Sequence, residues 1–276
     1  MDLGISASTV ALLVVALGAG GLLTGLLAGL FGIGGGAILV PVLYELWATL
    51  GVDPAIRMHL AVGTSLAVII PTSLKSFSAH RARGAVDLGL LRRLAIPVVL
   101  GVAAGSVIAS VSTSVVLKWV WAVFASIMAA KMLWGQNGWR LGNDIPKSWL
   151  VELYACFVGL ISTLLSIGGG AYITMLMTLY GRPIHQAVGT SSGFGPLIAI
   201  PGAIGFIVAG WSVAGLPPLS LGYVNLIGAA VIIPASVYAA PWGARIAHGI
   251  PKRKLEFAFG CFLAVIAIRY LVDLLG

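Results

Sequence analysis

The sequence predicts an all-α integral membrane protein built from two inverted repeats, each a glycine-broken helical hairpin followed by three transmembrane helices. Three observations support this prediction: the composition, a set of motifs that occurs twice in the same order, and the distribution of the basic residues. Of the 276 residues, 59% are hydrophobic and 9% are charged, and the mean hydropathy is +1.07. The main solvent of such a chain is lipid.

Six apolar stretches are long enough to cross a bilayer as helices, because about 20 helical residues span a hydrocarbon core of roughly 30 Å. They cover residues 59–74, 94–111, 116–132, 187–210, 221–242 and 255–274. Three of them fall in each half of the chain. Each group of three follows a longer apolar segment that contains three consecutive glycines, at residues 7–50 and 149–180.

The two halves of the chain carry the same motifs in the same order, which indicates an internal duplication. The matched blocks are IGGGA at 33–37 and 167–171, HLAVGTS at 59–65 with HQAVGTS at 185–191, and LKWVWAVF from Leu117 with LEFAFGCF from Leu255. We therefore expect a first membrane repeat at residues 1–135, a cytoplasmic connecting loop at 136–148 and a second, inverted repeat at 149–276.

The basic residues favour the inverted arrangement of the two repeats. If each triplet segment enters and leaves the membrane on the same side, only Arg57, Lys118 and Arg269 lie opposite the other 13 of the 16 Lys and Arg residues. A single crossing by each segment would instead separate Arg245–Lys254 from Arg140 and Lys147. That separation opposes the tendency of cytoplasmic loops to be positively charged. We expect both termini outside the cytoplasm.

The glycine triplets predict breaks in membrane helices, since each Gly costs about 1 kcal/mol relative to Ala inside a helix. Irregular backbone at membrane depth is tolerated only where protein buries it or where it lines a cavity. Free N–H groups and the helix dipole at the start of the next half-helix would favour an anion. Close packing of helices is the alternative, as for Gly21, Gly25 and Gly29. The candidate binding residues here are Gly34, Gly35, Gly36, Gly168, Gly169 and Gly170.

The repeated AVGTS motif adds hydroxyl groups and no charge near the start of a span in each half. Its candidate binding residues are Thr64, Ser65, Thr190, Ser191 and Ser192. Such hydroxyls also commonly bond the carbonyl one turn back or a neighbouring helix. His59 and His185 lie four residues before the motif glycine, on opposite sides of the membrane. They are candidate gating residues, with ordinary interfacial histidines as the alternative.

Several functional classes are disfavoured by what the spans lack. No span carries a central pair of carboxylates, which proton pumps and cation antiporters usually need. The sequence shows no pairing of nucleophile and base, no metal-binding cluster and no phosphate-binding loop, so we expect neither an enzyme nor a bound metal or cofactor. Cys156 and Cys261 lie alone in apolar stretches and read as core residues. The net charge of +8 is explained by topology, and no nucleic acid partner is expected.

The motifs together resemble the TauE/SafE family of bacterial membrane permeases, known for export of sulfite and organosulfonates. The resemblance is carried by GLFGIGGGAILVPVL, AVGTSLAVIIPTSLKSFSAHRARGAVDL, LLSIGGGAYITML and QAVGTSSGFGPLIAIPGAIG. It implies a secondary transporter in the bacterial inner membrane that exports a small sulfur-containing anion by alternating access, with the triplet glycines and the AVGTS hydroxyls as its site. Ser166 departs from strict symmetry, because the first half has Gly32 at that place.

Two other functions stay open at this point. One is a membrane scaffold or assembly protein whose glycines only pack helices, and the other is a transporter of another small anion or metabolite. The lipid bilayer is an expected partner in every case, and a homodimer is kept as an alternative to a monomer.

Overall fold

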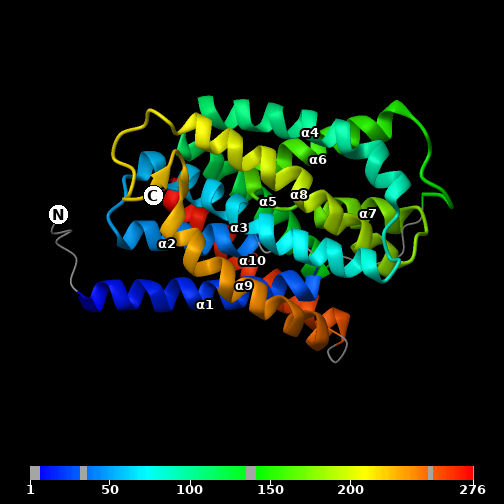
Figure 1. The fold of residues 1–276 in the computed structure, drawn as a ribbon, viewed down its shortest axis with the longest axis horizontal. Coiled ribbons are helices and arrows are strands. Elements are labelled where there is room, and N and C mark those ends of the chain that lie inside the picture. Colours follow the sequence, from blue (N-terminus) through cyan, green and yellow to red (C-terminus); the bar gives the residue numbers. More distant parts are fainter. Residues whose placement is uncertain (1–6, 32–35, 135–140, 248–250, 276) are drawn as a thin grey trace.

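The computed structural model describes residues 7–31, 36–134, 141–247 and 251–275, which form ten helices and one short hairpin (Figure 1). The elements are α1 Ala7–Phe31, α2 Gly36–Thr49, α3 Pro54–Ala82, α4 Leu88–Val111, α5 Ser114–Trp134, α6 Trp149–Leu165, α7 Gly170–Leu179, α8 Ile184–Ala209, β1 Ser220–Leu221, β2 Val224–Asn225, α9 Leu226–Ala247 and α10 Lys252–Leu275. The two strands pair antiparallel. The predicted all-α class is confirmed.

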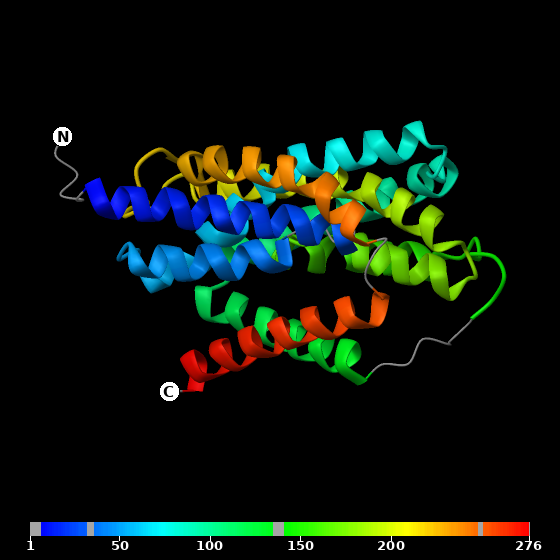
Figure 2. The same cartoon turned by 90° about the horizontal axis from the view of Figure 1, so that it is seen from below.

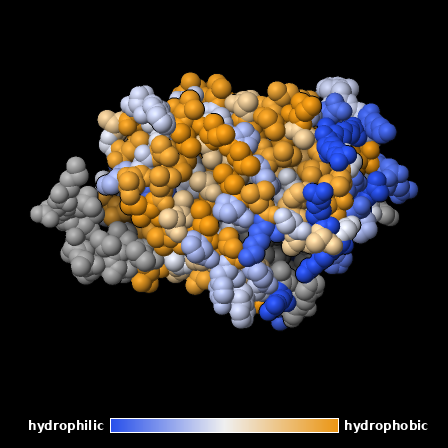
Figure 3. Space-filling view, viewed as in Figure 1, coloured by the Kyte–Doolittle hydropathy of each residue, from blue (hydrophilic) through white to orange (hydrophobic). Residues whose placement is uncertain are grey.

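Six helices in the described ranges are long and apolar enough to cross a membrane: α3, α4, α5, α8, α9 and α10. They correspond to the six spans that the sequence predicts. Large hydrophobic side chains such as Val107, Ile127 and Val265 point outward from them. Figure 3 shows the resulting apolar surface over the middle of the molecule, so these helices contact lipid.

Aspartates cap the starts of two of these helices, α3 and α4, and explain why both are longer than their apolar cores. Asp53 caps α3, since its side chain accepts a hydrogen bond from the backbone N–H of Ala55, and Pro54 supplies a favourable first residue. Asp87 caps α4 by accepting from the N–H of Leu90. These caps place the helix starts several residues before the apolar stretches begin.

Each predicted triplet segment forms a pair of helices, one on either side of the break, that run in opposite directions. In Figure 1, α1 runs towards the end where α3 finishes, and α2 returns towards the end where α3 starts. The second pair, α6 and α7, is shorter. At 1.5 Å per residue, the ten residues of α7 extend about 15 Å, roughly half the thickness of the hydrocarbon core. The second hairpin therefore contains a half-helix.

Helix packing is reciprocal between the two halves. Helix α1 packs along α9 and α6 packs along α4, while α2 packs on α3 and α7 on α8. At the centre α3 packs against α8, and α5 packs against α10 as a pair set to one side (Figure 2). Exchanging α1–α5 for α6–α10 reproduces these pairings, although α3 also packs against α5 without a comparable contact between α8 and α10. A two-fold relation between duplicated halves would give this pattern.

Glycines allow the closest of these approaches, at matching positions. A Cβ on Gly25 of α1 would collide with the backbone of Ser236 in α9, and one on Gly159 of α6 would collide with the backbone of Val98 in α4. Close packing through small residues is therefore present at Gly25. A Cβ on Gly21 would also contact α9, whereas the surroundings of Gly29 lie outside the described side chains.

The two ends of the bundle differ in charge. Hydrophilic side chains gather at the end where α3 finishes and α4 begins, on the right of Figure 3. Helix α1 begins and α10 ends at the opposite end (Figure 1). Arg57, Lys118 and Arg269 belong to that opposite end, at the start of α3, the start of α5 and the last turns of α10.

Candidate functional site

The two helix breaks meet inside the bundle. Gly36 is the first residue of α2, and a Cβ at this position would overlap the backbone carbonyl oxygen of Ser166, the residue that ends α6. Left-handed backbone at Ser166 (φ 52°) and Gly169 (φ 68°) turns the chain from α6 into α7. Gly34 and Gly35 lie outside the described residues. The structure thus brings Gly36 against the segment that contains the second triplet.

Backbone N–H groups are available where α7 begins. The first intrahelical bond of α7 runs from the N–H of Ile173 to the carbonyl of Gly169, 3.1 Å. Gly170, Ala171 and Tyr172 come before it, so their N–H groups have no carbonyl one turn back. Residues 162–170 are buried throughout. The positive end of the α7 dipole is therefore enclosed in protein, where electrostatic effects are stronger than in water.

Buried serine hydroxyls without a hydrogen-bond partner lie on the helices around the breaks. Ser162 lies in the last turn of α6 and Ser166 directly follows the helix, and their Oγ atoms have no partner among the described residues. Ser162 Oγ is 3.7 Å from the position of a Cβ on Gly169. Such groups are costly to bury unpaired, so they are available to a ligand.

Helix α3 contributes a third hydroxyl of this kind. Its Ile69 Cδ1 lies 3.1 Å from the position of a Cβ on Gly36, and Ser65 is one turn earlier on the same face. Ser65 is fully buried and its Oγ has no partner in the described part of the chain. Of the hydroxyls that the sequence singles out, all of which the structure describes, Ser65 alone combines burial with an unpaired oxygen.

Ser162 and Ser166 were not among the predicted binding residues. The signal that could have identified Ser162 and Ser166 is their place just before the triplet in STLLSIGGG, although Ser166 follows the end of α6 and does not share a helix face with Ser162. Thr163 lies between them, but its hydroxyl already donates to the carbonyl of Gly159, 2.8 Å. The sequence alone does not separate a paired hydroxyl from an unpaired one.

Thr64 and Thr190 hold the loops that lead into α9 and α4. Thr64 Oγ1 accepts from the N–H of Asn225, 2.9 Å, and Thr190 Oγ1 accepts from the N–H of Asp87, 2.8 Å. Both donating residues directly precede a helix, and Asn225 Oδ1 in turn accepts from the N–H of Gly228. The two threonines therefore make equivalent bonds in the two halves. This use of their hydroxyls is structural.

Ser191 and Ser192 are also engaged within the protein. Ser191 Oγ donates to the carbonyl of Val188, 2.9 Å, and accepts from the hydroxyl of Thr174, 3.0 Å. Ser192 Oγ donates to the carbonyl of Gly189. The second AVGTS motif thus differs from the first, where Ser65 is unpaired within the described ranges.

We expect Thr64→Val and Thr190→Val each to lower the stability of the folded protein by about 1–3 kcal/mol, because a buried backbone N–H loses its acceptor. Thermal melting of the purified variants in detergent measures this effect. Thr163→Val is the matched control, because its hydroxyl only bonds its own helix. Equal melting temperatures for Thr64→Val and Thr163→Val would contradict the structural use of Thr64.

The two candidate gating histidines lie at opposite ends of the bundle and in different surroundings. His59 is buried, with Nε2 3.1 Å from the carbonyl oxygen of Ala109 and Nδ1 3.4 Å from Ser114 Oγ. Its ring stacks on Tyr223 of the β1–β2 hairpin, with ring centroids 4.8 Å apart. Burial raises the pKa of the Tyr223 hydroxyl, which therefore stays neutral at physiological pH. His185 is exposed at the start of α8.

Six membrane-crossing helices, together with two broken hairpins that touch at their breaks, define a polytopic membrane protein with discontinuous helices at its core. A comparison with protein-family models matches residues 17–270 to the family described as "Sulfite exporter TauE/SafE". The chain belongs to the TauE/SafE family and is a membrane transporter of that family.

Relatives with similar sequences carry the same general description. A probable membrane transporter protein of Haemophilus influenzae is 33% identical over 250 residues, which cover 90% of this chain and 94% of the relative. A probable membrane transporter protein of Methanocaldococcus jannaschii is 26% identical over 258 residues, covering 91% and 93%. The probable membrane transporter protein YjnA of Bacillus subtilis is 25% identical over 273 residues, covering 90% and 96%. No solved structure matches the chain.

Proposed function

We propose that this transporter exports sulfite or a small organosulfonate, and that the anion binds where the two helix breaks meet. The observation that carries the proposal is the contact between Gly36 and Ser166, which places the starts of α2 and α7 near unpaired, buried serine hydroxyls. Amide and hydroxyl donors with helix dipoles suit an oxyanion. Sulfite export is the function in the name of the matching family model.

Alternating access of the substrate to the two sides is the proposed mechanism. The exchanged packing of α1–α5 and α6–α10 supports an inverted duplication with repeats at residues 1–135 and 149–276. In such transporters, one repeat rocks against the other around a site at their interface. The breaks belong to different repeats and touch each other, so rocking would expose the bound anion first to one side and then to the other.

Binding is tested by thermal melting of the purified protein with sulfite, sulfoacetate, taurine, sulfate and chloride at equal ionic strength. We expect the transported anion to stabilise the protein by about 2.7 kcal/mol at 100 times its dissociation constant. Replacing Ser162 and Ser166 together by Ala should weaken binding by about 10-fold or more, at about 1 kcal/mol for each hydrogen bond. Stability without anion should not fall, because neither hydroxyl has a partner to lose among the described residues.

Thr163→Val provides the control for this experiment, since its hydroxyl is committed to Gly159. An equal loss of anion affinity in Thr163→Val and in the double variant would argue against the site. No response of the wild-type protein to any of the five anions would favour a scaffold, or the transport of another metabolite. Sulfite tolerance of cells that express each variant at equal membrane levels then tests export itself.

The orientation in the membrane follows from the charged end of the bundle. We propose that the end rich in basic residues faces the cytoplasm, which places the start of α1 and the end of α10 outside. Single cysteines at Asn143 and Ser212, which are exposed at opposite ends, test this orientation in a chain without Cys156 and Cys261. An impermeant thiol reagent added to intact cells should label the cysteine at 212 and not the one at 143. The reverse labelling pattern would show that the protein has the opposite orientation in the membrane.

A further inference from the structure

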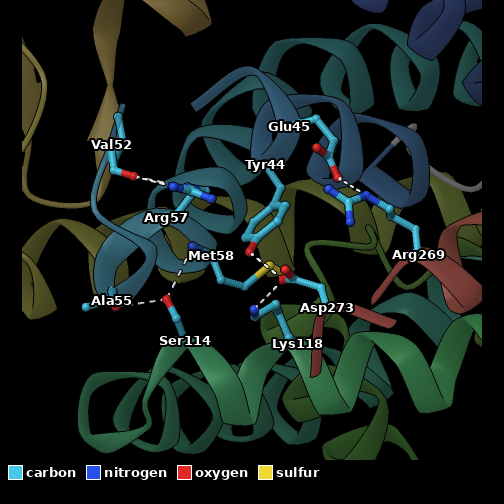
Figure 4. Close-up of polar contacts among 10 residues, drawn as sticks. All are labelled: Tyr44, Glu45, Val52, Ala55, Arg57, Met58, Ser114, Lys118, Arg269 and Asp273. Carbon is cyan, nitrogen blue, oxygen red and sulfur yellow. Dashed lines mark hydrogen bonds and ion pairs between the residues drawn. The ribbon is translucent and has the colours of Figure 1, made fainter. Parts of the chain in front are cut away.

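A second polar cluster lies away from the helix breaks, where α2, α5 and α10 meet near the start of α3 (Figure 4). At its centre, Lys118 Nζ donates to Asp273 Oδ2 at 2.6 Å, and the Tyr44 hydroxyl donates to the same oxygen at 3.2 Å. The Lys118 side chain is only 8% exposed, whereas that of Asp273 is 37% exposed. A buried cation is therefore paired with a carboxylate that reaches it from a partly open position.

Positive charge exceeds negative charge around Tyr44. Arg57 donates from Nε and Nη2 to the carbonyl of Val52, at 3.1 and 2.6 Å, and so has a neutral acceptor. Its guanidinium lies 5.5 Å from the centroid of the Tyr44 ring, and Lys118 Nζ lies 5.6 Å from it. Of these two cations, Lys118 is paired with the carboxylate of Asp273, and no carboxylate in the described part of the chain is paired with Arg57.

The neighbouring ion pair is balanced. Arg269 Nε lies 3.2 Å from Glu45 Oε1 (Figure 4), so this pair does not offset the surplus charge beside Tyr44. Glu45 follows Tyr44 on α2, and Arg269 is one turn before Asp273 on α10. The pair therefore provides an internal comparison for experiments on Asp273.

Two further donors in the same aromatic cluster are buried and lack a partner in the described ranges. They are the hydroxyl of Tyr270 and Nε1 of Trp121. The Tyr270 ring is 5.4 Å from that of Tyr44 and 6.4 Å from that of Trp121, measured between centroids. Tyr270 and Asp273 are three residues apart on one face of α10, as Lys118 and Trp121 are on α5. The cluster thus contains more donors than the single Asp273 carboxylate uses.

We propose that this cluster is a second anion site, in which the carboxylate of Asp273 takes the place of a small oxyanion. The inference rests on the proposed transport of an anion, and it adds a point on the path at the end opposite the basic face. A free anion is the occupant, because the Lys118 side chain is only 8% exposed and its ammonium lies against the Tyr44 ring, which leaves little room for a lipid headgroup. Asp273, in the last turn of α10, swings aside when the anion binds Lys118 and Tyr44.

The site is one-sided. The repeated block that begins LKWV in the first half begins LEFA in the second, so Glu256 stands where the first half has Lys118. A carboxylate at that place opposes anion binding. The second site therefore lies at one end of the proposed path and has no counterpart at the other.

Removal of the Asp273 charge tests the proposal. In Asp273→Asn we expect sulfite to stabilise the purified protein at a concentration about tenfold lower than in the wild type, since a competitor that fills the site nine-tenths of the time lowers apparent affinity tenfold. Glu45→Gln is the control, because it removes the same charge nearby without freeing Lys118. Adding Lys118→Met to Asp273→Asn should abolish the gain. If Asp273→Asn is not recovered folded, Asp273→Ser is titrated instead.

A gain in Asp273→Asn that exceeds the gain in Glu45→Gln supports the site, even where the wild type shows no response to sulfite. An unchanged or weaker response in Asp273→Asn overturns it, as does a gain of equal size in Glu45→Gln. Failure of the proposed export is a separate result, because it is read from sulfite tolerance of cells with the wild-type protein.

Discussion

Gly36→Ala should lower the stability of this transporter by about 3 kcal/mol or more, although it adds a single methyl group. The reason is geometric: the new Cβ would overlap the backbone carbonyl oxygen of Ser166, which cannot rotate away as a side chain can. The start of α2 and the end of α6 would have to separate. The melting temperature of the purified protein and its level in the membrane measure the effect.

Gly18→Ala, in contrast, should raise the stability of the folded protein. Gly18 lies inside α1, and an added methyl group would meet no neighbouring atom within 4 Å, so Ala there gains about 1 kcal/mol of helix propensity without a collision. Gly36→Ala and Gly18→Ala thus add the same methyl group, and only the packing around that group differs. If both variants melt at the wild-type temperature, the two breaks do not touch.

Gly25→Ala and Gly159→Ala should each destabilise the protein by about 2–3 kcal/mol, and by similar amounts. Each Cβ would press on the backbone of the helix that it crosses, at Ser236 in α9 and at Val98 in α4. Equal losses are expected because the two contacts occupy matching places in the two halves. Thermal melting of both variants measures the comparison.

Gly228→Ala is the control for this pair. Its Cβ would lie 3.4–3.5 Å from its neighbours, which is ordinary van der Waals contact, so little change is expected. A large loss in one of the two crossing variants and none in the other would argue against equivalent halves. That result would weaken the proposed inverted duplication without affecting the membership of the family.

Much of the fold was predictable because lipid imposes a simple rule on the chain. Six apolar stretches are expected to form helices, because a helix satisfies its own backbone hydrogen bonds in lipid. The two glycine triplets are expected to interrupt the remaining apolar segments, because glycine weakens a helix. The helix ends were less predictable. Helix α3 begins at Pro54 because Asp53 caps it, although the apolar stretch starts at His59.

The sequence could not show which hydroxyls beside the helix breaks lack a hydrogen-bond partner. Thr64 and Ser65 are neighbours in the sequence, yet Thr64 binds Asn225, 161 positions away, and Ser65 is left unpaired within the described ranges. Which of two adjacent hydroxyls is free depends on the loop that packs against the helix face. Ser162 and Ser166 could be identified only from the structure, which shows that no described residue hydrogen-bonds their hydroxyls.

The loops held by Thr64 and Thr190 are unequal. Residues 210–225 form the longer loop, in which a hairpin buries Val224 and Asn225, whereas residues 83–87 form a short turn on the other side. Uncovering the first side would expose apolar surface to water, and uncovering the second would move a short turn. Under the proposed alternating access, the two sides of the protein are thus expected to open at different energetic cost. The loops that cover the two sides, and not the proposed binding site, would then set the resting conformation.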